Sequence, residues 1–258
     1  MKIYFPQIPH WFEDVDSPLV CALLERWPTL KALQKARPDT LRSFFRRHHC
    51  RKEELIESRI KPIGEARPAL KDHAVVEAKV AVVKVLVQLI QVLHEGIEGL
   101  NQQIQEAAEA HPDFFIFESL PRAGATMAPR LLAAFGSQRE RYQNAAEVQI
   151  LSGIAPVTES SGKSSWVHFR FACPKFLRQS FHEWAALSIT QSQWARAYYE
   201  LQRRRGKKHH AAVRALAFKW IRVIYRCWKE RVAYDENVYL AALAKHNSPL
   251  VATTKAAL

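Results

Sequence analysis

The sequence predicts a mainly α-helical protein: a small helical bundle, a long coiled-coil helix, and a helical domain with a helix-hairpin-helix and one short strand segment. Three observations predict this fold class. Apolar residues recur at helical spacing through most of the chain, and a seven-residue apolar repeat runs from residue 72 to 109. Only 8 of the 258 residues are glycine, which disfavours β-rich folds with many tight turns.

The pattern divides the chain into a helical segment at 1–70, a coiled-coil helix at 71–110, a C-terminal domain at 111–248 and a disordered tail at 249–258. Within the first segment, helices are expected at 19–26, at 30–36 and at 50–63. Thr29 can cap the second of these, and Asp39 or Thr40 can cap one more that carries Leu41 and Phe44 on one face.

The long helix is predicted from two apolar rows. The first row is Val76, Val83, Ile90, Ile97 and Ile104, and the second contains Leu86, Leu93 and Leu100. β-branched residues in the first row and leucine in the second favour a two-stranded coiled coil, so a homo-oligomer through residues 72–109 is expected. The alternative is antiparallel packing inside one chain. Lys84 and Gln88 interrupt the apolar run, which argues against a membrane span.

The positive charge of the chain is confined to its second half. Residues 119–258 contain 22 Lys and Arg against 8 Asp and Glu, a net charge of +14, whereas residues 1–118 have a net charge of −1. Such asymmetry indicates a polyanionic partner, most often nucleic acid; the alternative is a protein that is merely basic. The four cysteines form no CxxC pair, so neither a zinc site nor a disulfide framework is predicted.

The segment Leu120–Ala125, followed by a helix at 126–135 and a second helix at 144–152, has the form of a helix-hairpin-helix. In this motif, N–H groups at a helix start meet a DNA phosphate. Gly124 would allow the close approach, and Arg122 and Arg130 would add charge. The alternative is an ordinary helical turn of the core.

Further basic residues follow this motif. A turn at 203–208 precedes a helix at 211–232, whose apolar face is opposed by a basic stripe. The candidate nucleic-acid contacts here are Lys163, Lys175, Arg178, Arg203, Arg204, Arg205, Lys207, Lys208, Lys219, Arg222, Arg226 and Lys229.

Ser161 is a candidate nucleophile. It precedes Gly162 and Lys163 and is followed by His168 and Arg170. A serine hydroxyl attacks phosphorus only when a base, a metal or positive charge activates it. A Ser-Gly pair in a turn is common, so the motif alone is weak.

Three segments carry a family resemblance: 151–163, 173–179 and 212–222. They resemble one family of bacterial insertion-sequence transposases. Members of this family have an N-terminal RuvC-like domain, which carries a DEDD metal-binding set, and a C-terminal helix-hairpin-helix domain, which carries a catalytic serine. A coiled coil joins the two domains. The resemblance covers the chain to about residue 250. It implies site-specific DNA recombination through a linkage between DNA and Ser161, with Ser160 as the less favoured neighbour. It also implies Mg²⁺ bound by the DEDD set, a guide RNA in some members, and dimers or tetramers.

Two departures from the family pattern affect what is expected. Arg122 stands where the hairpin usually has its first glycine. Tyr4–Gln7 resembles a point just after the first family domain, so the resemblance implies an amino-truncated copy that lacks the DEDD domain, with no metal site of its own. The expected function is DNA transposition in the cytoplasm of a bacterium, at the nucleoid. The alternative is a non-catalytic DNA- or RNA-binding remnant that oligomerises with, or regulates, an intact transposase.

Overall fold

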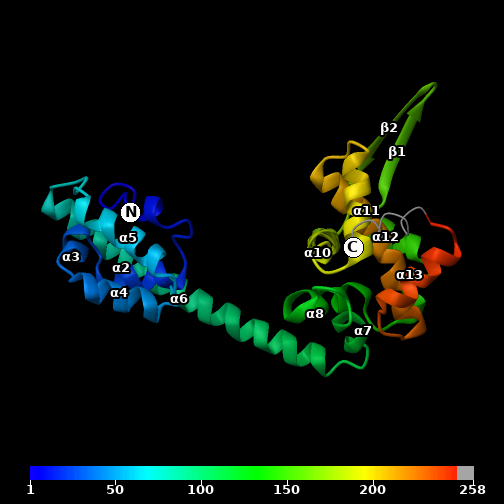
Figure 1. Ribbon diagram of the computed structural model, residues 1–258, viewed down its shortest axis with the longest axis horizontal. Coiled ribbons are helices and arrows are strands. Elements are labelled where there is room, and N and C mark those ends of the chain that lie inside the picture. Colours follow the sequence, from blue (N-terminus) through cyan, green and yellow to red (C-terminus); the bar gives the residue numbers. More distant parts are fainter. Residues whose placement is uncertain (249–258) are drawn as a thin grey trace. The chain divides into compact units, whose positions relative to one another are not determined.

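The computed structural model describes residues 1–248, which form two compact units; the first is Met1–Leu100, and the second begins at Asn101 (Figure 1). The mainly α-helical fold class is confirmed. The tail predicted to be disordered, 249–258, lies outside the described residues. None of the described helices combines the length and the apolar character that crossing a membrane requires.

Five short helices precede the long one in the first unit: α1 (Ile8–Trp11), α2 (Pro18–Arg26), α3 (Leu30–Gln34), α4 (Pro38–Arg47) and α5 (Glu53–Glu65). Ser17 and Thr29 cap α2 and α3 by accepting the N–H of Val20 and Ala32, at 3.5 and 3.1 Å. The Thr29 cap was predicted from the sequence.

Two expected helix starts in this unit were wrong. Helix α4 begins at Pro38 with Arg37 as N-cap, not with Asp39 or Thr40, because proline lacks an N–H and suits the first turn. Helix α5 begins at Glu53 rather than at residue 50, because the chain reverses at His49, whose φ is 62°. The core of the unit is aromatic, with Trp27 and Phe44 packed edge to face at 5.1 Å.

Helix α6 (His73–Glu109) starts at Asp72, whose carboxylate accepts the N–H groups of Ala74 and Val75. One of its faces lies in the core of Met1–Leu100. The residues of this face are Val76, Val80, Val83, Val87 and Ile90. Val76, Val83 and Ile90, the first three residues of the predicted coiled-coil row, therefore pack inside their own unit. This is packing within one chain, the alternative to a coiled coil between two chains.

The second unit is built around α12 (His209–Glu230). Helices α9 (Ala145–Leu151), α10 (Lys175–Ser188) and α11 (Gln193–Arg204) contact it. Its remaining elements are α7 (Phe114–Glu118), α8 (Gly124–Phe135), a 3₁₀ turn (Arg139–Arg141) and α13 (Glu236–Lys245). The predicted apolar face of α12 is confirmed, because every member is buried. That face is Val213, Leu216, Ala217, Trp220, Ile224, Cys227 and Trp228.

Four fully buried tryptophans join the segments of this unit. Each indole N–H donates to a different partner, which satisfies the one polar group of an otherwise apolar side chain. Trp184 bonds Pro121 O and Trp228 bonds Gly136 O, at 3.0 and 2.7 Å. Trp194 bonds the Tyr234 hydroxyl and Trp220 bonds the Ser188 hydroxyl, both at 2.8 Å.

A β-hairpin projects from the second unit (Figure 1). Strand β1 (Pro156–Ser161) pairs antiparallel with β2 (Ser164–Phe169). The sequence predicts a single strand segment near 166–171; the structure places it slightly earlier and adds a partner strand. The two-residue loop Gly162–Lys163 has a φ of 56° at glycine, which this kind of tight turn favours.

The hairpin is anchored at Gly153, directly after α9. Gly153 has a φ of 69°, and a Cβ at this position would overlap Cys173 Sγ and lie 2.8 Å from Cys173 Cβ. Only glycine allows the loop before α10 to approach the end of α9 this closely. The close approach brings together two of the segments that carry the family resemblance, 151–163 and 173–179.

Replacing Gly153 with alanine should destabilise the second unit by about 2–4 kcal/mol, from the left-handed backbone and the overlap with Cys173 together. Gly206→Ala is the matched control. Gly206 also has a positive φ, 81°, but a Cβ there would meet nothing within 4 Å, so about 1–2 kcal/mol is expected. Urea unfolding of both variants gives the comparison; equal losses would show that the contact with Cys173 costs nothing.

Candidate nucleic-acid interface

Ser161 lies at the end of β1, at the exposed end of the hairpin, and pairs with Ser164 across the turn. Its hydroxyl has no hydrogen-bond partner among the residues that the structure describes. Lys163 follows in the turn and is also exposed. The structure therefore presents this serine to solvent, where an extended macromolecule can reach it.

Alternation along the strands decides which residues share a face with Ser161. Ser161, Glu159, Trp166 and His168 lie on one face, whereas Ser160 lies on the other. His168 Nε2 lies 3.3 Å from Glu159 Oε1. Four residues, or about 13 Å, separate Ser161 from the position opposite His168 along the strand. His168 therefore pairs with Glu159 and does not activate Ser161 in this structure.

The predicted hairpin of the helix-hairpin-helix adopts the sharp turn that the motif needs. Arg122 has a φ of 59°, a value that the glycine expected at this position from the family pattern would reach without strain. The backbone N–H of Arg122 donates to Gln191 Oε1 at 2.8 Å. That N–H is therefore occupied. The next free donors are the exposed N–H groups of Gly124, Ala125 and Thr126 at the start of α8, which have no acceptor within residues 1–248.

Several predicted basic contacts are paired with acids. Arg130 Nη1 donates to Glu183 Oε2 at 2.8 Å, Arg226 Nε lies 3.1 Å from Glu230 Oε1, and Arg204 Nη2 lies 3.7 Å from Glu200 Oε2. Ion pairs of this kind neutralise part of the charge that a phosphate would meet.

Other predicted contacts are fixed by backbone carbonyls. Lys229 Nζ donates to Arg139 O at 2.8 Å, and Arg203 Nη1 donates to Lys207 O at 3.2 Å. Five other predicted nucleic-acid contacts have exposed side chains and take part in no ion pair of the described chain. They are Lys175, Arg205, Lys207, Lys208 and Arg222.

Residues 116–200, which include the hairpin of α7 and α8 and the strands around Ser161, match the family described as "Transposase IS116/IS110/IS902 family". This part of the chain is thus similar to the transposases that the family model describes. The match ends before α12, so all of the basic residues after residue 200 lie outside the matched part.

Three curated relatives align with nearly the whole chain. "Mini-circle putative transposase for IS117" of Streptomyces coelicolor is 26% identical over 94% of this chain. The IS110 43.6 kDa protein of the same organism is 28% identical over 87%, and the IS900 42 kDa protein of Mycobacterium paratuberculosis is 25% identical over 90%. The chain spans 60%, 55% and 58% of the lengths of these three relatives.

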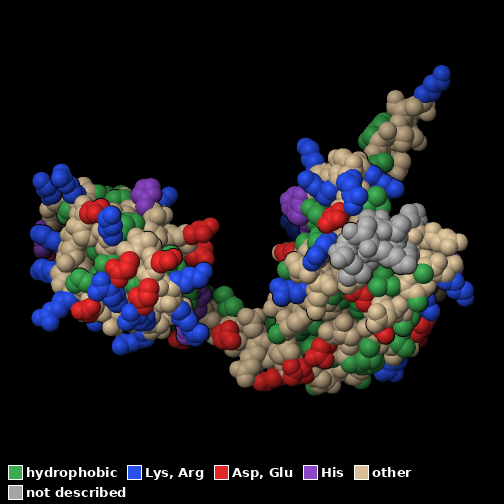
Figure 2. Space-filling view, in the orientation of Figure 1, with side chains coloured by type: hydrophobic (Ala, Val, Ile, Leu, Met, Phe, Trp, Pro, Cys, Tyr) green, Lys and Arg blue, Asp and Glu red, His purple; other side chains and the backbone are tan. Residues whose placement is uncertain are grey.

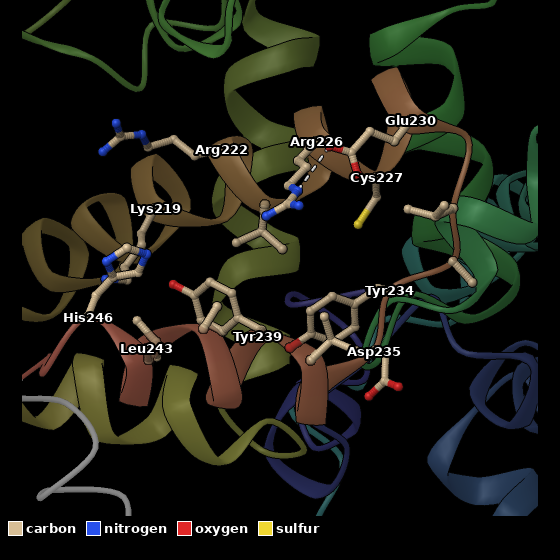
Figure 3. A pocket seen from close by; sticks show the side chains of 15 residues that line it. Lys219, Arg222, Arg226, Cys227, Glu230, Tyr234, Asp235, Tyr239, Leu243 and His246 are labelled. Atoms are coloured by element: carbon tan, nitrogen blue, oxygen red, sulfur yellow. Dashed lines mark hydrogen bonds and ion pairs between the residues drawn. The ribbon is translucent and has the colours of Figure 1, made fainter.

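Outside the matched part, α12 and α13 enclose a pocket of about 580 Å³ (Figure 3). Lys219, Arg222 and Arg226 of α12 line it together with Tyr234 and Tyr239. Burial, followed by the charge of Arg222, lowers the pKa of Lys219, whose ammonium lies 5.1 Å from the centre of the Tyr198 ring. Three residues of the predicted basic stripe of α12 thus line this pocket, and the fourth, Lys229, bonds to Arg139 O.

Sequence reasoning missed Arg214 among the basic residues of this unit. Its guanidinium lies 5.0 Å from the centre of the Phe169 ring at the base of the hairpin, and Arg178 lies 5.6 Å from the same ring. Arg214 stands apart from the predicted stripe of α12, and its proximity to Arg178 depends on how α10 packs against α12. No spacing in the sequence signals that contact.

The residues that the structure describes contain no group of three or more His, Cys, Asp or Glu side chains that could hold a metal ion. They therefore do not fit the Mg²⁺ that the resemblance implies for the DEDD set.

Because no base lies near its hydroxyl, Ser161 of the isolated chain should not react with a fluorophosphonate probe. Mass spectrometry of the treated chain should find Ser161 unmodified while a serine hydrolase in the same sample is labelled to completion. Labelling of Ser161 at a comparable rate would show that an activating group stands next to it.

Proposed function

We propose that this chain is the serine-bearing, DNA-binding part of an insertion-sequence transposase that acts in the bacterial cytoplasm, at the nucleoid. The observation that carries the proposal is the exposed Ser161 at the end of a hairpin, inside a matched transposase domain and within the half of the chain that has a net charge of +14. A polyanionic substrate fits this charge, and a projecting hairpin can reach its backbone.

In the proposed reaction, the Ser161 oxygen forms a bond to a backbone phosphorus of DNA. The bond from phosphorus to one bridging oxygen breaks, and that oxygen leaves with the bonding electrons. The exposed serine hydroxyl loses its proton to solvent hydroxide or water, and the leaving oxygen gains a proton from solvent. Lys163, next to the serine in the turn, is placed to stabilise the negative charge on the phosphoryl oxygens.

Three further features support contact with DNA. The exposed N–H groups at the start of α8 suit one backbone phosphate without reading sequence. Trp166 is half-exposed on the face of Ser161 and offers a surface for stacking on an unpaired base. The unpaired basic residues Arg205, Lys207, Lys208 and Arg222 extend the positive surface. A structured guide RNA is a second polyanion that the same surface would accept.

We also propose that the chain forms a homo-oligomer through α6. Six apolar side chains of this helix are 50–62% exposed and recur on average every 3.6 residues, since five steps span residues 82 to 100. These six are Val82, Leu86, Leu89, Leu93, Ile97 and Leu100, called the α6 stripe below. Such a stripe is complementary to itself, so we expect it to pack against α6 of a second copy of the chain. In this proposal the α6 stripe forms the contact between chains, instead of the row that begins at Val76 and was expected from the sequence.

The double variant Leu86→Gln, Leu93→Gln should shift the chain from dimer to monomer, because two central side chains of the α6 stripe become polar. Val85→Gln, Val92→Gln is the matched control: these residues are 56% and 65% exposed but lie beside the stripe. Light scattering after size-exclusion chromatography measures the mass. A wild-type monomer, or equal effects of the two double variants, would contradict a dimer through this stripe.

A second candidate function is regulation of an intact transposase by a chain that binds nucleic acid but does not cut it. The α6 stripe favours this reading, because it would also pair with the same helix of a longer family member. The absence of a base beside Ser161 in the described chain fits it as well.

One experiment tests both functions. The chain is mixed with Mg²⁺ and DNA that carries the element's ends, alone and with an intact family transposase of different mass. A covalent protein–DNA adduct that resists detergent and has the chain's mass is expected for wild type and for Ser160→Ala, because Ser160 faces the other side of the hairpin. Ser161→Ala should abolish it.

The other outcomes separate the two functions. If the chain forms no adduct but suppresses the adduct of the intact transposase, the regulatory function holds and the catalytic one fails. If the chain neither forms an adduct nor affects its partner, both functions fail. An adduct that survives in Ser161→Ala and is lost in Ser160→Ala would move the nucleophile to Ser160.

A further inference from the structure

Three arginines from separate segments lie at the base of the hairpin, and the side chains of two of them, Arg178 and Arg214, meet at the Phe169 ring. Arg170 directly follows β2, Arg178 lies on α10, and Arg214 lies on α12. The guanidinium groups of Arg178 and Arg214 lie 5.6 and 5.0 Å from the centre of the Phe169 ring, and Arg178 Nη1 donates to Arg170 O at 3.2 Å. Figure 2 shows Lys and Arg side chains gathered where the hairpin joins the helices.

No carboxylate within residues 1–248 forms an ion pair with any of the three. The nearby Glu183 accepts from Arg130 and Gln179 instead. Arg170 Nε is buried and has no hydrogen-bond partner in the described chain. The cluster therefore holds donors that the protein itself leaves unsatisfied, a condition that is rare for buried polar groups.

Two histidines lie on the same helices as these arginines. His182 on α10 lies beside His210 at the start of α12, with ring centres 5.5 Å apart. Burial, more than any neighbour, lowers the pKa of His182, and the charge of Arg214 acts in the same direction. Burial, followed by the charge of Arg178, also lowers the pKa of Arg214. Bringing the charges of Arg178 and Arg214 together costs the free protein stability that a bound anion would restore.

We propose that Arg178 and Arg214 form a cradle for a backbone phosphate of duplex DNA, separate from the phosphate at Ser161. A guanidinium group matches two oxygens of a phosphate with parallel N–H groups. Both guanidinium groups lie over the Phe169 ring, which restrains their side chains, so little side-chain freedom is lost when the phosphate binds. That the polyanion is DNA rests on the proposed function.

The register of the hairpin sets the distance between the two phosphates. Phe169 pairs with Pro156 and Ser161 pairs with Ser164, five residues further along the strand. This separation is about 17 Å, at ~3.3 Å per residue. A length of about 17 Å corresponds to about five base pairs along the axis of a DNA duplex, at ~3.4 Å each.

Binding of the full chain to a 30-base-pair DNA duplex, followed by fluorescence anisotropy over a range of salt concentrations, tests the cradle. Arg214→Gln should weaken binding about tenfold or more, and should reduce the slope of log affinity against log salt by about 0.9, the loss of one phosphate contact. Arg141→Gln is the matched control, because Arg141 also stacks on an aromatic ring, 5.2 Å from the centre of Tyr142, but is exposed and outside the cluster. It should leave the slope unchanged.

Arg178→Gln provides a second variant, and thermal melting without DNA checks the folding of both. We expect melting temperatures equal to or above that of wild type, because each substitution removes an unpaired charge. Arg214→Lys should recover only part of the affinity, since lysine keeps the charge and loses the planar fork. A salt slope in Arg214→Gln equal to a steep wild-type slope would overturn the cradle.

Two further outcomes separate the cradle from the proposed function. If wild type binds duplex DNA with a flat salt slope, the DNA-binding function fails. Inorganic phosphate then tests the cradle alone: it should raise the melting temperature of wild type but not of Arg214→Gln, and equal shifts overturn the cradle. If duplex RNA binding weakens in Arg214→Gln while DNA binding does not, the cradle serves RNA and the DNA proposal is wrong.

Discussion

The second unit depends on four buried indoles whose N–H groups reach four different segments. Trp184 fixes the turn between α7 and α8, Trp228 fixes the end of α8, Trp220 fixes the end of α10, and Trp194 fixes the chain before α13. All of them pack in one core with α12. Because a buried indole N–H without an acceptor is costly, each bond selects one position for its segment. The turn between α7 and α8 is placed by this set of contacts.

Periodicity predicted the parts of the fold that bury an apolar stripe. The face of α12 and the extent of α6 were visible because their side chains repeat at helical spacing. The sequence could not show which row of α6 faces its own core, since Val76 and Leu86 belong to equally regular rows. Strand β1 was missed because Pro156–Ser161 is polar and almost entirely exposed; it forms a strand because Gly162 allows the turn and β2 supplies its partner.

The candidate site was predictable only in part. Ser161 and the basic residues after it could be named, the serine through its family resemblance. The acids that pair with Arg130 and Arg226, and the meeting of Arg178 with Arg214, arise from tertiary packing that no short-range spacing records. The half-buried arginines that form no ion pair in the described chain are the informative ones, because a stable fold has no need of such charges.

The hairpin carries two adjacent serines on opposite faces, so its pairing register decides which hydroxyl accompanies Glu159 and Trp166. A shift of one residue in a two-stranded ribbon exchanges its faces. Neither strand has a broad buried face that would correct such a slip, since almost all residues of β1 and β2 are exposed. The Gly162–Lys163 turn and the anchor at Gly153 therefore fix the two ends of β1. The number of residues between these two points determines which serine lies on the face of Glu159 and Trp166.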